Sequence, residues 1–220
     1  MPTSISPTLL ADQIAAFTDS MSKAVPPEVI ALLGSELTRL AESGILENAL
    51  KVGQTAPDFT LLEARGQQVR LSGLLAKGPV VVTFYRGGWC PFCNLQLRAY
   101  QSVLPEIHRL GAELVAISPQ TPDYALTDAE QKALTFPVLS DRHNTVARSY
   151  GLVYTLSDAL QRLQEGFGNP LPKFNGEASW ELPTPGTFII DSGGLVRLAH
   201  VDVNYMHRLE PSVLLDALRP

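Results

Sequence analysis

A short segment with two cysteines, flanked by two apolar runs, constrains the fold of this chain most strongly. Residues 79–85, Pro-Val-Val-Val-Thr-Phe-Tyr, form a continuous β-branched and aromatic run that predicts a buried strand. Helical spacing of apolar residues continues from the cysteines to about Leu110, where Gly111 ends it. Residues 113–118 predict a second strand. Because strand–helix–strand connections are right-handed, we expect two parallel neighbouring strands.

The rest of the chain predicts an α/β domain with a helical extension before it. Apolar spacing predicts helices over residues 8–21 and 28–43, separated by Pro26-Pro27. We therefore divide the chain into an N-terminal helical extension, 1–50, and a main domain, 51–220. The other expected elements are hairpins at 59–71 and 187–200, helices at 123–134, 144–150 and 211–218, a short strand at 137–140 and a long loop at 166–185.

Composition excludes several classes of function. The 220 residues carry a formal net charge of −5, and no run of Lys or Arg appears, so we expect neither nucleic-acid binding nor attachment to a membrane surface. No stretch approaches the roughly 18 apolar residues of a membrane-spanning helix. The first residues lack the basic and apolar pattern of a signal peptide, which makes the cytoplasm the expected location.

The cysteines are Cys90 and Cys93, in the segment Trp89-Cys-Pro-Phe-Cys, where the first strand ends and the helix begins. The unpaired N–H groups and the dipole of a helix N-terminus stabilise a thiolate there. Arg86 is close enough in sequence to add positive charge, and Trp89 contacts a partner protein or packs against the motif. In such a pair, one cysteine attacks and the other resolves the mixed disulfide or sulfenic acid.

Two other interpretations of the cysteines are a zinc half-site and an inert buried pair. Zinc needs further ligands, but the chain has no second cysteine pair, and its four histidines are not spaced as zinc ligands. A Cys-x-x-Cys pair at a strand–helix turn is typical of redox sites. We therefore predict redox chemistry without a metal or another cofactor.

Three segments resemble the alkyl hydroperoxide reductase/thiol-specific antioxidant family, the peroxiredoxins. They are Gly53-Gln-Thr-Ala-Pro-Asp-Phe-Thr-Leu, the strand at 80–85, and Gly186-Thr-Phe-Ile-Ile-Asp-Ser-Gly-Gly-Leu-Val-Arg. The resemblance implies a thioredoxin fold, a central mixed β-sheet flanked by helices, and reduction of hydroperoxides. It places the peroxide-attacking cysteine at Cys93. Where the family carries a proline, a threonine and an arginine around that cysteine, this chain has Arg86, Cys90 and Pro185.

Two of these departures are similar to thioredoxins instead. Cys90 completes a Trp-Cys-x-x-Cys motif, and Pro185 falls where thioredoxins carry a cis-proline that faces the disulfide. We therefore expect a cis bond at Pro185, with Thr184 and Pro185 presenting backbone to the substrate. The loop at 166–185 either covers the site as a lid or lies on the surface with Trp180 turned inward.

Three hypotheses follow from these patterns. In the first, Cys93 attacks a hydroperoxide, Cys90 resolves the sulfenic acid, and an external dithiol such as thioredoxin or glutathione restores both thiols. In the second, Cys90 is the nucleophile of thioredoxin-like disulfide exchange. In the third, the chain is a redox-sensing binding protein. The N-terminal helices are expected to pack on the domain or on a second copy in a homodimer. The first hypothesis is the main prediction.

Overall fold

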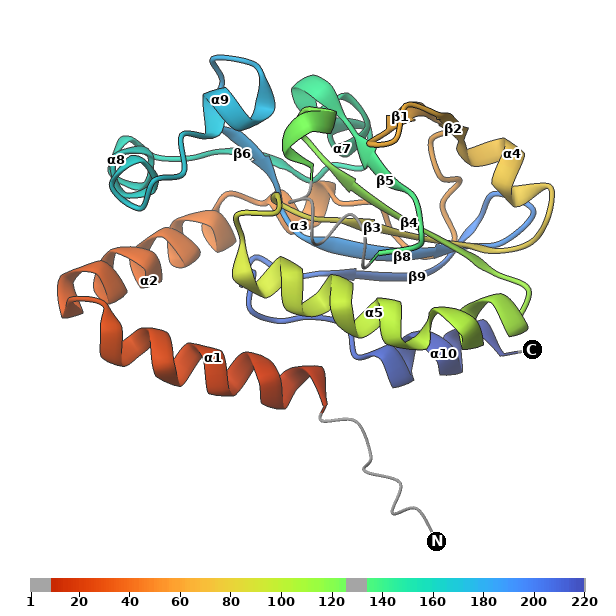
Figure 1. Cartoon of the computed structure of the whole chain (residues 1–220), viewed down its shortest axis with the longest axis horizontal. Helices are drawn as coiled ribbons and strands as arrows, with labels where there is room; N and C mark the ends of the chain where they lie inside the picture. Colours follow the sequence, from red (N-terminus) through yellow and green to blue (C-terminus); the bar gives the residue numbers. More distant parts are fainter. Residues whose placement is uncertain (1–8, 126–133, 220) are drawn as a thin grey trace, which may run out of the picture.

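The chain is described from a computed structural model that covers residues 9–125 and 134–219. Its centre is a seven-stranded sheet with the order β2-β1-β5-β4-β3-β8-β9 (Figure 1). The strands are β1 (Thr60–Glu63), β2 (Gln68–Arg70), β3 (Val80–Phe84), β4 (Glu113–Ser118), β5 (Val138–Ser140), β8 (Gly186–Ile190) and β9 (Val196–Val201). The predicted hairpins β1–β2 and β8–β9 are both antiparallel, as expected.

The middle of the sheet is strand β3, which lies parallel to β4 on one side and antiparallel to β8 on the other. The parallel pairing of β3 and β4 confirms the prediction from the strand–helix–strand pattern. Every residue of β3 is buried, because both faces of the sheet are covered by helices or loops. The end of β3 is thus a fixed point from which the cysteine segment starts.

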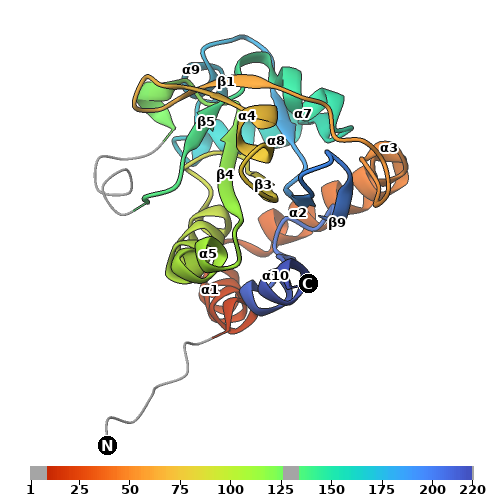
Figure 2. The ribbon, with the colours of Figure 1, turned by 90° about the vertical axis from the view of Figure 1, so that its right-hand side faces the viewer.

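Helices α5 (Pro91–Arg109), α10 (Pro211–Leu218) and α1 (Leu10–Ala24) lie together on one face of the sheet (Figures 1 and 2). Their apolar sides share one core cluster, which includes Ile14, Leu97, Tyr100 and Leu214. The opposite face carries α4 (Leu71–Leu75), α7 (Thr145–Ser149) and a second cluster around Phe84. The cysteine segment belongs to the first cluster.

The N-terminal helices are α1 and α2 (Pro27–Glu42), close to the predicted ranges, followed by the single turn α3 (Ile45–Asn48). Gly44 ends α2 in the left-handed conformation, with φ of 74°. Helix α1 packs across α5, where the rings of Phe17 and Phe92 meet edge to face with 5.2 Å between centroids. The division of the chain at residue 50 stays a prediction.

The prediction of a long loop at 166–185 is wrong in part. This segment contains helix α9 (Leu171–Asn175) and strand β7 (Glu181–Pro183), which pairs with β6 (Val153–Thr155) in a small second sheet. Helix α8 (Asp158–Gly166), capped by Ser157, precedes it and was not predicted. Three-residue strands that pair over such a sequence distance leave no periodic signal.

Two single-turn 3₁₀ helices complete the described structure, at Pro122–Tyr124 and Arg142–Asn144. The first covers the start of the helix expected at 123–134, and residues 126–133 of that helix lie outside the described residues. No helix within the described ranges is both long and apolar enough to cross a membrane.

Candidate active site

The turn between β3 and α5 sets the position of the cysteines. Gly87 has a φ of 142°, and a Cβ there would lie 2.5 Å from Trp89 Nε1, so only glycine fits. The Cys90 N–H donates to the Gly87 carbonyl over 3.1 Å and closes the turn. The chain therefore enters the helix at Cys90, six residues after β3 ends.

Both cysteines lie at the start of α5, as the sequence predicts. Cys90 is the N-cap residue, Pro91 is the first helical residue, and Cys93 lies in the first turn. Both are free thiols, and both have 0% exposure. The helix N-terminus places its partial positive charge beside both sulfurs, which favours a thiolate. Reagents reach neither sulfur without a local opening.

Arg86 contacts the first cysteine. Its Nη2 donates a hydrogen bond to Cys90 Sγ over 3.3 Å. The guanidinium carbon lies 3.9 Å from the ring centroid of Tyr205 and 5.1 Å from that of Trp89, so two aromatic rings hold the cation. Arg86 also lines a cavity of about 40 Å³ between α2 and Tyr154. The structure thus places the charge of Arg86 in direct contact with Cys90, where the sequence predicted a positive charge beside the motif.

Arg208, in the loop after β9, contacts the second cysteine and was missed by the sequence analysis. Its Nη2 lies 3.5 Å from Cys93 Sγ. Its other groups are fixed: Nη1 donates to Gln96 Oε1 over 2.7 Å, and Nε donates to the Tyr205 carbonyl over 2.6 Å. No local pattern links residue 208 to the motif. One indirect signal was present: Gln96, a polar residue one helical turn after Cys93, lies on the apolar side of the predicted helix and so indicates a buried polar partner.

A buried network of hydrogen bonds holds Gln96, the side chain that binds Arg208. Gln96 Nε2 donates to the Tyr100 hydroxyl over 3.0 Å, which in turn donates to the Leu209 carbonyl over 3.1 Å. Thr187 Oγ1 lies 3.3 Å from the Tyr100 hydroxyl and 3.0 Å from Thr83 Oγ1. Burial raises the pKa of Tyr100 to about 12, so the hydroxyl stays a neutral donor. This network fixes the Gln96 amide that orients Arg208.

The two thiols have unequal acidity. Burial acts to raise the pKa of the Cys90 thiol, but the hydrogen bond from Cys93 and the charge of Arg86 outweigh it and lower that pKa well below its usual range. Burial raises the pKa of Cys93, and the neighbouring Cys90 raises it further, against the charge of Arg208. The pair therefore loses its first proton easily and its second with difficulty, and the negative charge rests mainly on Cys90.

Thr184 and Pro185 lie beside the turn but not in the expected conformation. The β3–β8 register pairs Phe84 with Gly186, which sets the preceding Thr184 and Pro185 next to the segment leading to the cysteines. Both are buried, and Thr184 Oγ1 has no hydrogen-bond partner among the described residues. The prediction of a cis bond at Pro185 is wrong, because no peptide bond in the described ranges is cis. A trans bond there leads the backbone directly into β8.

The segment that was predicted as a lid or surface loop packs beside the motif. Trp180 is partly buried and turned inward, as one of the two interpretations has it. It shares a small cluster with Trp89, which is built on Leu156, Leu171 and Leu182. Trp89 is half-buried, and its Nε1 has no hydrogen-bond partner within the described structure. Contact of Trp89 with a partner protein stays a prediction.

The described residues contain no group of three His, Cys, Asp or Glu side chains that could hold a metal ion. What the site does contain is a pair of thiols, two guanidinium groups and a helix N-terminus. This set can stabilise one thiolate at neutral pH and orient a small polar reactant at sulfur.

A family model described as the AhpC/TSA family matches residues 52–199. The chain belongs to this family. The match runs from before β1 into β9 and includes the cysteine segment and α5, whereas the end of β9, α1 and Arg208 lie outside it. The family resemblance inferred from the three sequence segments is thereby confirmed.

Relatives of this AhpC/TSA family member include two kinds of thiol enzyme. Alkyl hydroperoxide reductase E of Mycobacterium tuberculosis is 30% identical over 154 residues, which cover 69% of this chain and 86% of that protein. Thiol-disulfide oxidoreductase ResA of Geobacillus thermodenitrificans is 29% identical over 152 residues, which cover 69% of this chain and 70% of that protein.

A solved structure gives the same fold. Peroxidoxin BcpB from Mycobacterium tuberculosis has a TM-score of 0.60 at 25% sequence identity, and the likeness covers 77% of this chain and 96% of that one. The central mixed sheet with helices on both faces is the thioredoxin fold, which confirms the predicted fold class.

Proposed function

We propose that this protein is a thiol-dependent peroxidase that reduces hydroperoxides through Cys93 and Cys90. The observation that carries the proposal is the pair of buried thiols at a helix N-terminus, each sulfur in contact with one guanidinium, in a chain of the AhpC/TSA family. The relatives named as alkyl hydroperoxide reductase E and peroxidoxin support the same chemistry.

The reaction has two steps at the cysteines. The Cys93 thiolate attacks the terminal peroxide oxygen, so an S–O bond forms as the O–O bond breaks. The Cys93 sulfur is oxidised to a sulfenic acid, and the alkoxide takes up the proton of the Cys90 thiol and leaves as an alcohol. Cys90, now a thiolate, then attacks the sulfenic sulfur. The S–S bond forms as the S–O bond breaks, and the departing hydroxide takes a proton from solvent and leaves as water.

Arg86 and Arg208 have different roles in the proposed reaction. The resting charge lies mainly on Cys90, beside Arg86, and Cys93 holds the shared proton. Transfer of that proton from Cys93 to Cys90 moves the thiolate to Cys93, where Arg208 stabilises it. Arg208 is also the donor closest to the peroxide oxygens during attack, since charge develops on the leaving oxygen. The family carries an arginine at the position of Pro185. In this proposal, Arg208 supplies the positive charge that this arginine would provide.

An external thiol reductant completes the cycle. We propose a dithiol of the thioredoxin type or glutathione, which attacks the disulfide and leaves both cysteines reduced. Trp89 is the half-buried side chain next to Cys90 and is the proposed contact for this partner, with Thr184 and Pro185 alongside it. A cytoplasmic location, where such reductants are abundant, and a homodimer through the N-terminal helices belong to the same proposal.

A second candidate function is disulfide exchange with Cys90 as the nucleophile. The lowered pKa of Cys90 and its contact with Arg86 favour it, as does the likeness to the thiol-disulfide oxidoreductase ResA. Its first step forms a mixed disulfide on Cys90, which Cys93 resolves.

One preparation tests both candidates. We expect the reduced protein to consume hydrogen peroxide and tert-butyl hydroperoxide with thioredoxin and its reductase as the electron source, and to reduce insulin disulfides at least tenfold more slowly. The control is the double variant Cys90→Ser/Cys93→Ser, which keeps the fold and lacks both thiols. Insulin reduction without peroxide consumption would reject the peroxidase in favour of the second candidate.

A further inference from the structure

Arg86 lies between the thiol pair and a small cavity that the proposed reaction does not use. Its Nη2 donates to Cys90 Sγ over 3.3 Å, and the same residue lines a cavity of about 40 Å³ beside helix α2. That volume exceeds the ~10–15 Å³ that one water molecule needs, and it is far below the ~300 Å³ at which sites for drug-sized ligands begin. The cavity therefore has the size of a small inorganic species.

The walls of the cavity are largely apolar. Five leucines from α2 and from the segment around α8 line it: Leu33, Leu37, Leu40, Leu156 and Leu160. Leu40 is the only buried residue of α2, a helix that the structure describes in full, so this wall opens at low cost. A charge between such walls is screened less than in water, and its interaction with Arg86 is correspondingly stronger.

The charge of Arg86 is balanced mainly by the thiol pair. Arg86 is 8% exposed, and its buried Nε has no hydrogen-bond partner among the described residues. The groups that act most on its charge are Cys90, Cys93, Tyr154 and Tyr205. Burial raises the pKa of both tyrosines, so they stay neutral. The Cys90 thiolate is thus the anion that balances a buried guanidinium.

A carboxylate also lines the cavity, but it is already bound. Glu36 Oε2 accepts from Arg39 Nε over 2.8 Å, and Glu36 Oε1 accepts from the Ser157 hydroxyl over 2.8 Å. Arg39 lines the cavity as well, so the charges of Glu36 and Arg39 cancel each other. Arg86 is left with the thiolate as its own counter-ion.

Oxidation of the pair removes this counter-ion. When a hydroperoxide or a foreign disulfide oxidises the cysteines, two electrons leave the pair as the S–S bond forms, and the O–O bond or the foreign S–S bond breaks. One thiol proton and one negative charge leave with the reduced products. A buried cation without a partner is costly, and stacking on aromatic rings balances only part of a full charge.

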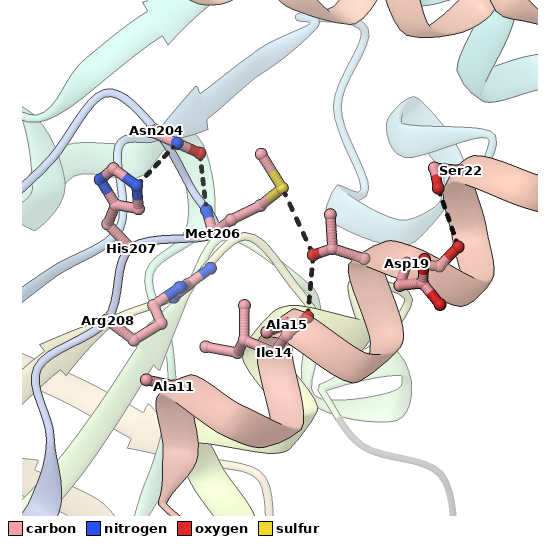
Figure 3. A pocket seen from close by; sticks show the side chains of 10 residues that line it. Ala11, Ile14, Ala15, Asp19, Ser22, Asn204, Met206, His207 and Arg208 are labelled. Atoms are coloured by element: carbon pink, nitrogen blue, oxygen red, sulfur yellow. Dashed lines mark hydrogen bonds between the residues drawn. The ribbon is translucent and has the colours of Figure 1, made fainter.

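Arg208 loses the same thiolate but stays near water. It is partly exposed and lines the open groove of about 670 Å³ between α1 and the loop after β9 (Figure 3). Solvent and dissolved ions screen its charge there. The imbalance that oxidation creates therefore falls on Arg86.

We propose that the cavity beside Arg86 binds a small monovalent inorganic anion, of the size of chloride, when Cys90 and Cys93 form their disulfide. The anion replaces the thiolate as the partner of Arg86. The reduced protein binds it weakly, because thiolate and anion would then share one guanidinium. A ligand that prefers the oxidised form stabilises that form, so the anion favours the disulfide. The inference goes beyond the peroxidase and requires only that the two cysteines form a disulfide.

The test is a redox equilibrium at varied chloride. The protein is equilibrated at pH 7 with dithiothreitol in its reduced and oxidised forms. Chloride is raised from about 1 to about 100 mM, and gluconate, which is too large for the cavity, keeps the ionic strength constant. We expect the ratio of oxidised to reduced protein to rise about fivefold, as for a dissociation constant of about 25 mM in the oxidised form. A constant ratio overturns the proposal.

Variants of α2 and of Arg86 assign the effect to the cavity. Leu33→Phe narrows the cavity, and Leu32→Phe is the matched control, because Leu32 is the neighbouring half-buried residue of α2 and does not line it. We expect Leu33→Phe to reduce the chloride effect to less than about twofold, Leu32→Phe to keep it and Arg86→Met to abolish it. A full effect in Leu33→Phe or Arg86→Met overturns the cavity as the site. If Leu33→Phe does not fold, Leu37→Phe takes its place.

A second readout measures binding without redox chemistry. Chloride NMR lines should broaden more with the oxidised protein than with the reduced protein, and the oxidised Arg86→Met protein should lose the difference. Equal broadening by the two redox forms of the wild type overturns the proposal.

Glu36 offers the other way to balance Arg86. If its carboxylate turns to Arg86 on oxidation, the wild type shows no chloride effect and Glu36→Gln acquires one, which overturns the proposal. The outcome is separate from that of the peroxidase, because the dithiothreitol equilibrium uses no peroxide. A constant ratio leaves the peroxidase in place, and a protein that consumes no hydroperoxide still tests the anion site. If no Cys90–Cys93 disulfide forms, both proposals fail.

Discussion

Arg86 and Arg208 reach the two sulfurs from opposite directions in the sequence. Arg86 lies four residues before Cys90, whereas Arg208 comes from a loop more than a hundred residues after Cys93. Both guanidinium groups are planar, permanently charged donors, which suits contact with a thiolate and a peroxide oxygen at once. At the level of single residues, the two cysteines therefore share one negative charge, and each sulfur contacts one arginine.

Replacement of Arg86 tests this electrostatic account. Arg86→Met keeps the length of the side chain and removes its charge, so the pKa of the Cys90 thiol should rise. A smaller thiolate population should slow alkylation by iodoacetamide at pH 7 about tenfold, and the pH profile should move to higher pH. Arg86→Lys, the matched control, should keep most of the rate. Identical pH profiles for wild type and Arg86→Met would show that the charge of Arg86 does not set the acidity of the pair.

At the scale of the element, α1 closes the site. Phe17 packs against Phe92 inside the cysteine motif, and the ring of Phe92 lies at a tilt against that of Tyr205, with 5.6 Å between centroids. Tyr205 in turn covers the Arg86 guanidinium. Since neither sulfur is exposed, substrate and reductant both need this aromatic cover to move. The helix that was predicted to pack on the domain or on a second copy packs on the domain and is part of the wall around the thiols.

Phe17→Ala should loosen this cover. The lost ring pair is worth about 1 kcal/mol, so the open state should be populated about fivefold more. Alkylation of the reduced cysteines by iodoacetamide should accelerate by the same factor at a pH where the thiolate population is saturated. Phe167→Ala, at an exposed ring after α8, serves as the control and should leave the rate unchanged. Equal rates for Phe17→Ala and wild type would mean that α1 does not limit access.

Prediction from sequence succeeds for elements with a local period and fails where contacts are remote. Strands β3 and β4, helix α5 and the β8–β9 hairpin follow from apolar runs, helical spacing and a Ser-Gly-Gly turn, so their positions agree with the expectation. The pairing of β6 with β7 joins two three-residue segments about thirty residues apart, which no periodic pattern reveals.

The same limit applies within the site. Cys90, Cys93 and Arg86 are adjacent in sequence, so their proximity was predictable from the strand–turn–helix pattern. Arg208 reaches Cys93 only through tertiary packing, and the trans bond at Pro185 depends on how β8 joins the sheet. The likeness of Cys90 and Pro185 to thioredoxin positions predicted a redox-active cysteine pair, but it did not predict the trans peptide bond at Pro185.

Over the whole molecule, a segment that matches the family model is combined with a helix and a loop that lie outside the match. The cysteine segment and all of the sheet except the end of β9 lie within residues 52–199, which match the AhpC/TSA family model. Helix α1 and the loop with Arg208 lie outside that range and pack onto the same pair of thiols. The matched segment supplies the pair of thiols, and α1 and the loop with Arg208 supply part of the wall around them.

The peroxidase proposal depends most directly on which sulfur a peroxide oxidises. Reduced Cys90→Ser and Cys93→Ser proteins are treated with one equivalent of hydrogen peroxide and a sulfenic-acid trap, and the modified residue is located by mass spectrometry. We expect a trapped sulfenic acid on Cys93 in the Cys90→Ser protein and little product in the Cys93→Ser protein. A trapped sulfenic acid on Cys90 alone, or stable mixed disulfides on Cys90 without peroxide consumption, would contradict the proposal.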